Sequence, residues 1–396
     1  MKEGWECKKL GEVGEFVRGG NFSKKDFVED GFPCIHYGQI HMRFGVETFK
    51  HLSSVPAEMV KPDRCAKKGD LVIAITSEDD AGSCKCTAWM GDYDAYVGGH
   101  AAIYRHTMQP KYVSYYFMSP FFQKDKLEFT HGFKVVEISP KDIAKIKIPV
   151  PPLSEQQSIV DYLDSAFAKI DAMKANAEKA LNEAKALFQA SLKEMLEPKE
   201  GWEEKTLKET CSVITDGTHH SPINTANGKY KYVTAKNIKP WGLDLRNITF
   251  VSEDVHKEIV SRCCPQKGDV LYIKDGATTG IAIVNPLDEE FSLLSSVALI
   301  RPNKNIMLSE YLCYALNSPS IYEQTRSQMD GAAITRVTLV KIKGFTIPLP
   351  PLSEQQSIVA TLDSLKSKVD KLQENYDKIS QECDALKQAI LRQVFE

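Results

Sequence analysis

The sequence has 396 residues, with 50 Lys and Arg against 53 Asp and Glu for a formal net charge of −3, and 42% of its residues are hydrophobic. This composition is ordinary for a water-soluble globular protein of two or three domains, and it excludes a mini-protein, a disordered chain and a collagen. The longest apolar runs, such as residues 71–75, fall far short of the roughly 20 residues that a bilayer crossing needs. Residues 1–10 contain no apolar signal core. We therefore expect a cytoplasmic protein without a membrane segment.

The cysteines do not predict a disulfide framework or a metal site. All ten are scattered along a chain without a secretion signal, which favours reduced thiols. Cys84 and Cys86 are one residue apart and Cys263 and Cys264 are adjacent. A zinc knuckle usually has two to four residues between its sulfurs, so we expect no zinc in this chain.

An internal repeat of about 199 residues organises the chain. The sequence IPVPPLSEQQSIV at residues 148–160 recurs as IPLPPLSEQQSIV at 347–359. At the same offset YVSYYFMSP (112–120) aligns with YLCYALNSP (311–319), and KGDLVIAI (68–75) aligns with KGDVLYIK (267–274). Both copies open with EGWE, and they diverge widely between these anchors. This indicates two modules that do the same type of job on different targets.

Residues 1–153 are the first predicted domain, a compact α+β domain with short β-rich runs such as 71–76. Two polar stretches in it contain side chains that can bind phosphates or base edges. These candidates are Arg18, Asn21, Lys24, Lys25, His36, Gln39 and Arg43.

Residues 154–198 are predicted to form one long helix. It follows a proline pair, and Ser154 with Gln157 three residues later is typical of a capping box. No Pro or Gly appears until Pro198, so the helix spans about 40 residues, roughly 60 Å. Apolar and small residues recur at spacings of four and three, which is typical of a coiled-coil seam: Leu163, Ala166, Ile170, Met173, Ala177, Ala180, Ala184, Leu187 and Ser191.

Residues 199–352 are the second predicted α+β domain, with β-rich runs at 270–273 and 342–347. A cluster of basic residues, Lys229, Lys231, Lys236, Lys239 and Arg246, lies among aromatic residues. Lysines neutralise phosphates, and Lys236, Asn237 or His219 can donate to base edges, although a solvated strand edge explains the cluster equally well. We interpret residues 216–220, DGTHH, as a loop on a DG turn rather than a metal or catalytic site.

Residues 353–396 are predicted to repeat the long helix, with a capping box at Ser353 and Gln356. Its seam consists of Leu362, Leu365, Val369, Leu372, Tyr376, Ile379, Cys383, Leu386 and Ile390. These residues are larger than their counterparts in the first helix, and a seam of small residues buries more area against a large one. Each helix packing only on its own domain is the alternative.

The very short link at residues 198–201 makes an antiparallel pairing of the helices the easier connection. We therefore predict two α/β domains joined by an antiparallel intramolecular coiled coil. Such a chain has a pseudo-two-fold axis and resembles a homodimer written as one polypeptide.

Charge and catalytic motifs limit what the chain does alone. Residues 1–153 contain 21 Lys and Arg against 20 Asp and Glu, and residues 199–352 contain 18 against 17. A net charge of +1 per domain gives little electrostatic attraction to DNA phosphates, so we expect a partner protein to supply part of the affinity for DNA. There is no G-x-x-x-x-G-K-[ST] motif for ATP, and no Asn/Asp-Pro-Pro-aromatic motif of the kind that amino-methyltransferases use.

The chain resembles the specificity subunits of type I restriction-modification systems over its whole length. The resemblance rests on GWE at Trp5 and Trp202, DGTHHSP (216–222), YVTAKNI (232–238), DGATTG (275–280), GAAITRV (331–337) and, above all, the two IP-x-PPLSEQQ segments. The first domain departs from this pattern, with GSCKC at 82–86 where a glycine-containing loop is expected and GFKVVEIS at 132–139 in place of GAAITRV.

The resemblance implies a non-enzymatic reader of double-stranded DNA with two target recognition domains, each recognising one half of a split asymmetric site. It implies assembly with two modification (methyltransferase) subunits and with restriction subunits, and these partners bind S-adenosylmethionine, ATP and Mg²⁺. No cofactor is expected in this chain. Carried over to this sequence, the DNA contacts are Thr218, His219, His220, Lys236, Asn237, Thr278, Thr279 and Arg336, and residues 18–25 are the first-domain equivalent.

The resemblance also implies that the long helices bind the partner subunits. A different class remains open, namely a scaffold whose globular ends bind peptides. A neighbouring gene for an Asn-Pro-Pro-aromatic methyltransferase would favour the DNA reader.

Overall fold

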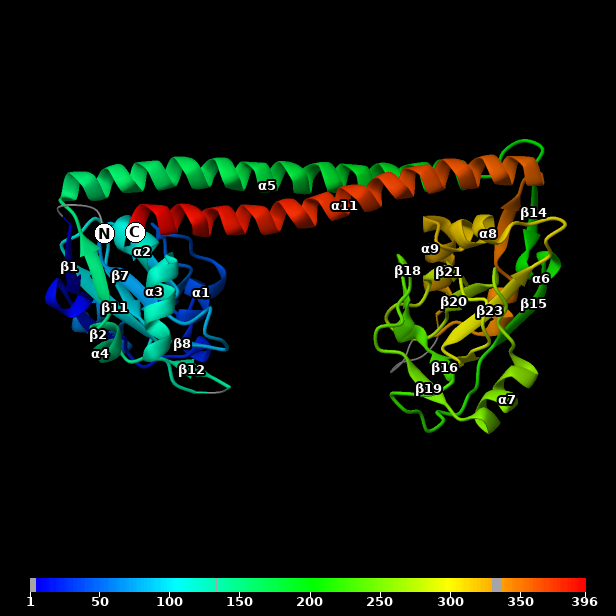
Figure 1. Ribbon diagram of the computed structural model, residues 1–396, viewed down its shortest axis with the longest axis horizontal. Helices are drawn as coiled ribbons and strands as arrows, with labels where there is room; N and C mark the ends of the chain where they lie inside the picture. The colour runs from blue at the N-terminus through cyan, green and yellow to red at the C-terminus, as the bar shows by residue number, and fades with distance from the viewer. Residues whose placement is uncertain (1–4, 133, 330–335) are drawn as a thin grey trace. The chain divides into compact units, whose positions relative to one another are not determined.

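A computed structural model describes residues 5–132, 134–329 and 336–396. The chain divides into two compact units. Unit 1 comprises Met1–Ala177 and Tyr376–Glu396, and unit 2 comprises Glu178–Asn375. Each unit therefore contains one globular domain and part of both long helices (Figure 1).

Unit 1 is a mixed α/β domain in which helices α2 and α3 cover a sheet (Figure 1). Its strands are β1 (Glu6–Lys9), β2 (Gly14–Arg18), β3 (Phe32–Ile35), β4 (Glu47–Thr48), β5 (Ser53–Val55), β6 (Cys65–Ala66), β7 (Leu71–Ala74), β8 (Thr76–Ser77), β9 (Cys86–Trp89), β10 (Ala95–Val97), β11 (Ala101–His106), β12 (Val136–Glu137) and β13 (Lys147–Val150). Its shorter helices are η1 (Leu10–Glu12), η2 (Lys24–Asp26), α1 (Tyr37–Met42), η3 (Ala57–Met59), η4 (Pro62–Arg64), α2 (Pro110–Met118), α3 (Pro120–Asp125), η5 (Lys126–Glu128) and α4 (Pro140–Ile143).

Unit 2 repeats most of these elements. Its strands are β14 (Glu203–Thr206), β15 (Cys211–Asp216), β16 (Tyr230–Val233), β17 (Ile238–Lys239), β18 (Gly242–Leu243), β19 (Thr249–Val251), β20 (Val270–Ile273), β21 (Ala282–Val284), β22 (Ser292–Leu293), β23 (Val297–Pro302) and β24 (Thr346–Leu349). Its shorter helices are α6 (Leu207–Thr210), η6 (Ala235–Asn237), α7 (Glu253–Arg262), α8 (Ser309–Leu316), α9 (Pro319–Ser327) and α10 (Leu339–Lys343). The predicted strand at 270–273 is confirmed, but 342–347 is wrong as a strand, because the end of α10 and a turn occupy most of it.

Most strands in the sheets of the two units correspond, and β4 and β6 of unit 1 have no counterpart among the described strands of unit 2. The main sheet has the order β2-β11-β7-β9-β4 in unit 1 and β15-β23-β20-β21 in unit 2. A second sheet runs β5-β3-β10-β6 in unit 1 and β19-β16-β22 in unit 2, and β1·β13 matches β14·β24. The one addition to the main sheet of unit 1 is β4, which pairs in parallel with β9. The repeat seen in the sequence is thus a repeat of topology.

The two long helices are α5 (Leu153–Leu196) and α11 (Leu352–Phe395). Both begin one residue before the predicted serine, so Ser154 and Ser353 lie inside the first turn and the predicted capping boxes are wrong. The carbonyl of Pro152 accepts from the amides of Glu155 and Gln156 at 2.9 and 3.0 Å, and Pro351 does the same in α11.

A buried glutamine then anchors each helix to its own domain. The Gln156 amide donates to Pro151 O at 2.8 Å and accepts from the Gln109 amide at 2.8 Å. Gln355 makes the same contacts with Pro350 O and the Leu308 amide, at 2.8 and 2.9 Å.

The helices pair antiparallel in each unit, as predicted. In unit 1 Lys174 contacts Asp384 at 3.6 Å and Asp171 contacts Lys387 at 2.5 Å. The residue numbers therefore rise along one helix while they fall along the other. In unit 2 Lys185 donates to Gln373 at 2.8 Å. These two residues are the repeat counterparts of Asp384 and Lys174, so the helices pair in the same register in both units.

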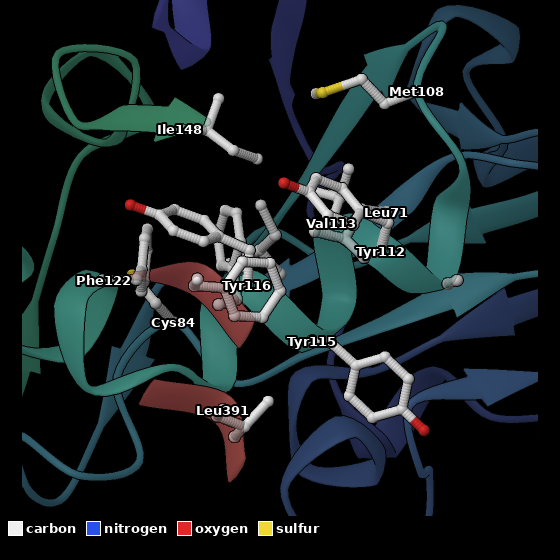
Figure 2. Close-up of a cluster of buried hydrophobic side chains, with 14 of the residues drawn as sticks. Leu71, Cys84, Met108, Tyr112, Val113, Tyr115, Tyr116, Phe122, Ile148 and Leu391 are labelled. Atoms are coloured by element: carbon white, nitrogen blue, oxygen red, sulfur yellow. The ribbon is translucent and has the colours of Figure 1, made fainter. Parts of the chain in front are cut away.

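The last turn of each long helix enters the core of the unit where it ends. In unit 1 Leu391 of α11 is buried in the same cluster as Tyr112 and Tyr116 of α2 (Figure 2). Phe395 of α11 is buried there too, with its ring centroid 5.4 Å from that of Tyr112. In unit 2 the repeat counterparts Leu192 and Leu196 of α5 are buried in the equivalent cluster. The alternative of a helix that packs only on its own domain is therefore wrong.

The predicted seam is correct in part and wrong in phase. Leu163, Ile170, Leu362 and Cys383 are buried, and Ala180 is exposed. The half-buried seam residues are Ala166, Ala177, Ala184, Ser191, Leu365, Val369, Leu372, Tyr376, Ile379 and Ile390. Met173, Leu187 and Leu386 are 58%, 61% and 47% exposed, so they lie outside the seam. Their neighbours Lys174, Phe188 and Lys387 take those positions, because a lysine stem covers apolar surface while its ammonium reaches a carboxylate.

Three further features bear on function. All ten cysteines are free thiols. Across the described ranges, no group of three or more His, Cys, Asp or Glu side chains is placed to hold a metal ion. No helix among the described residues combines the length and apolar character that a membrane crossing requires.

Candidate nucleic-acid interface

The predicted loops of both units start at the same corner of the fold, where a strand of the main sheet ends. In unit 1 β2 ends at Arg18 and Gly19 follows, and in unit 2 β15 ends at Asp216 and Gly217 follows. A Cβ atom at Gly19 would collide with the carbonyl of Gly98, and one at Gly217 with the carbonyl of Leu293. Only glycine allows the chain to cross its neighbour so closely, so both loops leave the sheet along the same path.

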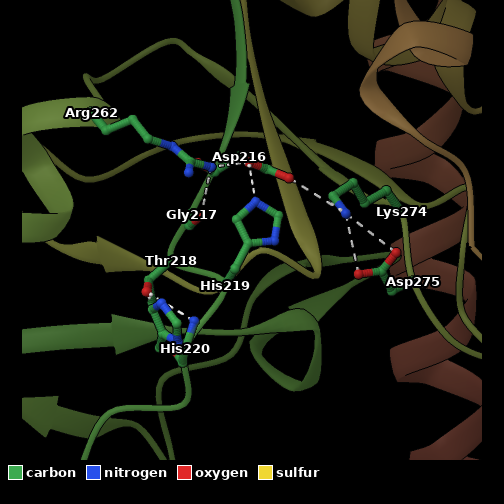
Figure 3. Close-up of polar contacts among 8 residues, drawn as sticks. All are labelled: Asp216, Gly217, Thr218, His219, His220, Arg262, Lys274 and Asp275. Atoms are coloured by element: carbon green, nitrogen blue, oxygen red, sulfur yellow. Dashed lines mark hydrogen bonds and ion pairs between the residues drawn. The ribbon is translucent and has the colours of Figure 1, made fainter.

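In unit 2 this corner is built around a buried carboxylate. Asp216 is 2% exposed and bonds the guanidinium of Arg262 through Oδ1. Its Oδ1 also lies 3.3 Å from His219 Nε2, and its Oδ2 lies 3.5 Å from the Lys274 ammonium (Figure 3). Lys274 is itself buried and contacts Asp275 at 3.2 Å. Buried charges need such mutual compensation, so this network fixes the start of the loop.

The network presents two histidines at the surface. Arg262 also donates to the carbonyls of Asp216 and Gly217 at 3.2 and 3.1 Å, which holds the backbone of the turn. Thr218 is committed to the same turn, because its hydroxyl accepts from the His220 amide at 3.2 Å. The His219 side chain remains 57% exposed although Asp216 orients its ring, and His220 is exposed.

In unit 1 the same corner carries the opposite charge. Arg18 occupies the position of Asp216 and is exposed, donating to Gly99 O and to Glu137 at 3.2 Å each. The residue at the Lys274 position is Ile75, which is fully buried.

Strand pairing confirms the correspondence of these positions. Thr76 pairs with Glu137 as Asp275 pairs with Arg336. Unit 1 therefore has an arginine and a glutamate where unit 2 has an aspartate and an arginine.

A hollow beside the corner of unit 1 collects several predicted residues. Arg18, Asn21 and His36 line it, together with Arg64 and His100. Arg64 donates to Gly19 O at 3.1 Å, and His100 Nδ1 lies 3.2 Å from the Thr76 hydroxyl. Burial is the main cause that lowers the pKa of His36, so this imidazole is neutral at pH 7.

Several predicted contact residues are already bonded within the protein. His36 and Gln39 cap α1, with the His36 amide donating to Gln39 Oε1 at 3.0 Å, and Gln39 also donates to Ser53. In unit 2 the Thr234 amide donates in the same way to buried Asn237 at 3.0 Å. Gln39 and Asn237 thus have both side-chain polar atoms bonded within the protein, and His36 accepts from the Gly38 amide through Nδ1. These side chains shape the loops.

Two more of the predicted DNA-contact residues, Thr279 and Lys231, have their polar groups bonded within unit 2. The hydroxyl of buried Thr279 donates to Gly276 O at 2.7 Å inside its turn. Lys231 donates to both carboxylate oxygens of Glu289 at 2.7 Å, which neutralises its charge.

The other predicted residues are exposed or half-buried, and they lie on loops or in the short elements η2, η6 and β17. They are Asn21, Lys24, Lys25 and Arg43 in unit 1, and Lys229, Lys236, Lys239, Thr278 and Arg336 in unit 2. Lys229 lies over the Tyr230 ring, 4.8 Å from its centroid, which places an ammonium beside an aromatic face. The remainder of the GAAITRV motif, residues 331–335, and Phe133 of GFKVVEIS lie outside the described residues.

The departure of unit 1 at GSCKC is a longer loop that keeps the same ending. Cys84 donates from its amide to Ala74 O at 2.9 Å, as Gly280 does to Ile273 O. Both residues have positive φ, +60° at Cys84 and +108° at Gly280. Cys84 is buried, which raises the pKa of its thiol to about 12.

The extra residues of this loop are held by Lys126. Its ammonium is buried and donates to Asp80 O and Ser83 O at 2.6 Å each. Burial lowers the pKa of Lys126, so the two carbonyls compensate an otherwise costly charge.

Sequence reasoning missed four charged or polar residues at the two corners: Arg64, His100, Arg262 and Lys274. Lys274 had a signal, because the repeat aligns this lysine with an isoleucine in an apolar strand. The other three come from segments that no motif joins to the corner.

Comparison with known proteins identifies the type of fold and its relatives. The family model described as type I restriction modification DNA specificity domain matches residues 2–183 and 199–381. Two curated relatives are similar over 100% of this chain and 89% of their own length. They are the StySPI specificity subunit of Salmonella potsdam, 23% identical, and the EcoKI specificity subunit of Escherichia coli strain K12, 22% identical.

Solved structures agree. A chain from work on complex assembly and conformational transition of the type I R-M system has a TM-score of 0.79 and 22% identity, over 100% of this chain and 98% of its own length. The HsdS subunit from Thermoanaerobacter tengcongensis has a TM-score of 0.60 and 20% identity, over 100% of this chain and 97% of its own.

Proposed function

The chain belongs to the family of type I restriction-modification DNA specificity proteins, and we propose that each of its units reads one half of a bipartite, asymmetric site in double-stranded DNA. As a specificity protein it recognises DNA sequence and is not itself a catalyst. The observation that carries the proposal is the corner at the ends of β2 and β15. The backbone there is the same in both units, whereas the side chains are inverted in charge. Two units that share a backbone but differ in surface charge recognise different half-sites.

Within each unit the exposed residues divide into two roles. Lys24, Lys25, Lys229 and Lys236 bind phosphates, which positions the loops but carries no sequence information. Asn21 in unit 1 and His219 and His220 in unit 2 reach base edges, with Asp216 orienting the His219 ring. In this proposal the untouched gap between the half-sites is set by the 44-residue helices that connect the units.

The long helices bind partner subunits through the apolar residues that the antiparallel seam leaves exposed. Unit 1 has exposed Met173 and Leu386 at one level of its helix pair, and unit 2 has the repeat counterparts Leu187, which is exposed, and Leu372, which is half-buried. Exposed apolar residues on paired helices are typical of protein contacts. Their repetition supports two equivalent sites, and hence two modification subunits per chain, to which restriction subunits add.

Cofactors belong to those partners in this proposal. S-adenosylmethionine is bound by the modification subunits, and ATP with Mg²⁺ by the restriction subunits. The assembled complex acts in the cytoplasm.

Mapping of methylated adenines tests the DNA-reading proposal. The chain is expressed with its modification subunit in cells that lack other adenine methyltransferases. The expected motif has two specified blocks separated by a fixed unspecified gap. A single continuous motif would contradict the proposal.

Native mass spectrometry tests the proposed assembly. We expect two modification subunits on the unaltered chain, and one after either Leu386→Glu in unit 1 or Leu187→Glu in unit 2, because each charge disables one apolar site. The double variant should bind none. An unchanged count in all three variants would remove the helix faces from the interface.

A further inference from the structure

Strand β4 covers one edge of the main sheet in unit 1. The Ala88 amide of β9 donates to Val46 O at 2.9 Å, and the Met90 amide donates to Thr48 O at 2.8 Å. Glu47 of β4 contacts Lys111 of α2 at 3.0 Å, and the same ammonium contacts Asp164 of α5 at 2.6 Å. An extended segment is thus held here by backbone hydrogen bonds and one central charge.

Among its described residues, unit 2 has no strand paired at this place. Its edge strand is β21, and over the residues that the structure describes no other strand pairs with its outer side. The side chain of Asn317 bonds both backbone groups of Ala282, at 3.1 and 2.9 Å, and so satisfies one residue of the edge.

The segment that replaces α1 and β4 in the chain is the β17–β18 hairpin. It lies beside β21 without pairing to it and carries Trp241, which is 66% exposed.

A mostly apolar groove remains between the hairpin, β21 and the helices of unit 2. Its apolar walls are Phe188, Leu192, Trp241, Leu243, Ile283 and Pro286. The groove belongs entirely to unit 2, and none of the motifs assigned to DNA reading lines it. An open apolar groove beside an unpaired strand edge is a typical site for an added peptide segment.

The charges of the groove are changed relative to unit 1. Glu310 stands at the repeat position of Lys111 and is exposed on the groove wall. Asp363 stands at the position of Asp164 and accepts from the Tyr314 hydroxyl at 2.6 Å. Lys366 is the one cation on the described lining. Two carboxylates against one ammonium leave the wall net acidic, where unit 1 has a lysine facing Glu47.

We propose that this groove binds an extended, mostly apolar segment of a partner protein that carries a lysine or arginine where β4 carries Glu47. The basic side chain faces Glu310 and Asp363, and the apolar residues cover Trp241 and Ile283. The Val284 amide already hydrogen-bonds the Cys313 sulfur, and Pro286 at the Met90 position offers no donor, so the segment is held by its side chains rather than by a ladder of backbone hydrogen bonds. The site is independent of DNA reading, because it uses a different surface of unit 2.

Peptides from the chain's own β4 test this proposal. The probe is a fluorescently labelled peptide of residues 44–50 with Glu47→Lys, and its matched control is the same peptide with Glu47 retained. Both are titrated against the full chain by anisotropy. We expect the lysine form to bind at least tenfold more tightly, and Glu310→Lys in the protein to reverse that preference. A gained preference cannot come from misfolding.

Two surface variants locate the binding. Trp241→Ala should weaken binding of the lysine peptide at least tenfold, while Ile223→Ala, which removes a 92% exposed apolar residue elsewhere on unit 2, should leave it unchanged. Equal affinity for both peptides, no binding of either, or full binding to Trp241→Ala would overturn the proposal. Displacement of the bound peptide by double-stranded DNA would assign the groove to nucleic acid instead.

Discussion

The corner after β2 in unit 1 and the corner after β15 in unit 2 follow one backbone path with different electrostatics. In unit 1 an exposed arginine, Arg18, pairs with Glu137 at the surface. In unit 2 a buried aspartate, Asp216, is surrounded by Arg262, His219 and Lys274. The glycine that follows each strand preserves the path, so the charges change without a change of fold.

At the starts of the long helices the two units are equal. The Trp5 indole donates to Glu155 at 3.0 Å and the Trp202 indole donates to Glu354 at 3.1 Å. Such paired contacts join each domain to the start of its long helix. The two units therefore share a backbone frame, whereas the charged side chains on the surface of the corner differ between them.

The largest expected difference between the units is the cost of removing the corner charge. Asp216→Ala leaves Lys274 and Arg262 without their buried counter-charge and should destabilise unit 2 by about 3 kcal/mol. Arg18→Ala removes an exposed pair and should cost unit 1 less than about 1 kcal/mol. Hydrogen exchange of the β15 and β2 amides measures each cost locally. Similar costs in both units would refute the distinction between the corners.

Acid should also separate the units. Burial lowers the pKa of His106 in unit 1 to about 4, whereas the strand position that matches it in unit 2 is Pro302. The unfolded chain, with a pKa near 6.5, binds the proton first, so stability is lost as pH falls from about 6.5 toward 4.

The loss should reach about 2 kcal/mol at pH 5. Denaturant unfolding at pH 7 and pH 5 measures it, and His106→Gln should reduce the difference between the two pH values by this amount. An identical pH dependence in the variant would rule out His106 as the cause.

The shared frame should respond equally in both units. The Tyr115 hydroxyl donates to Asp164 at 2.6 Å, and the Tyr314 hydroxyl donates to Asp363 at 2.6 Å. Tyr115→Phe and Tyr314→Phe should each cost about 1.5 kcal/mol, because each removes one hydrogen bond to a carboxylate. Hydrogen exchange at the start of α5 and of α11 is the measurement. Costs that differ by more than about twofold would mean that the frame is not equivalent.

The smallest expected effects concern the binding of DNA phosphates by single lysines. Lys24→Ala in unit 1 and Lys229→Ala in unit 2 should each lower the slope of log K against log salt by about 0.9, since each removes one phosphate contact. Lys231→Ala is the control, because Glu289 already neutralises that lysine and the slope should stay unchanged. DNA titrations between 50 and 200 mM salt give these slopes. A loss at Lys231 equal to that at Lys229 would contradict the assignment.

Much of the frame could be predicted from the sequence because it repeats. The offset of 199 residues and the absence of Pro and Gly in two long segments predicted the two helices, and the short link at residues 198–201 predicted their antiparallel pairing. The seam phase was not predictable from hydrophobicity alone. Met173 and Leu386 look better suited to a core than Lys174 and Lys387, yet the lysine stems pack inward while their ammonium groups meet Asp384 and Asp171.

The candidate site was less accessible to sequence reasoning. The DGTHH motif marked the loop of unit 2 correctly, but the partners of Asp216 come from α7 and from the end of β20, 46 and 58 residues farther along the chain. No local pattern joins such segments. Several polar residues that look suited to bases, such as His36, Gln39 and Asn237, are caps, and a cap is recognised only when its backbone partner is known.

The central claim is that each unit reads its own part of the DNA. Methylated adenines should be mapped for two variants expressed with the modification subunit, Asn21→Ala with Lys24→Ala in unit 1, and His219→Ala with His220→Ala in unit 2. The account predicts that each variant relaxes one block of the motif and leaves the other block and the gap unchanged. Relaxation of the same block by both variants, or of the whole motif by either one, would contradict it.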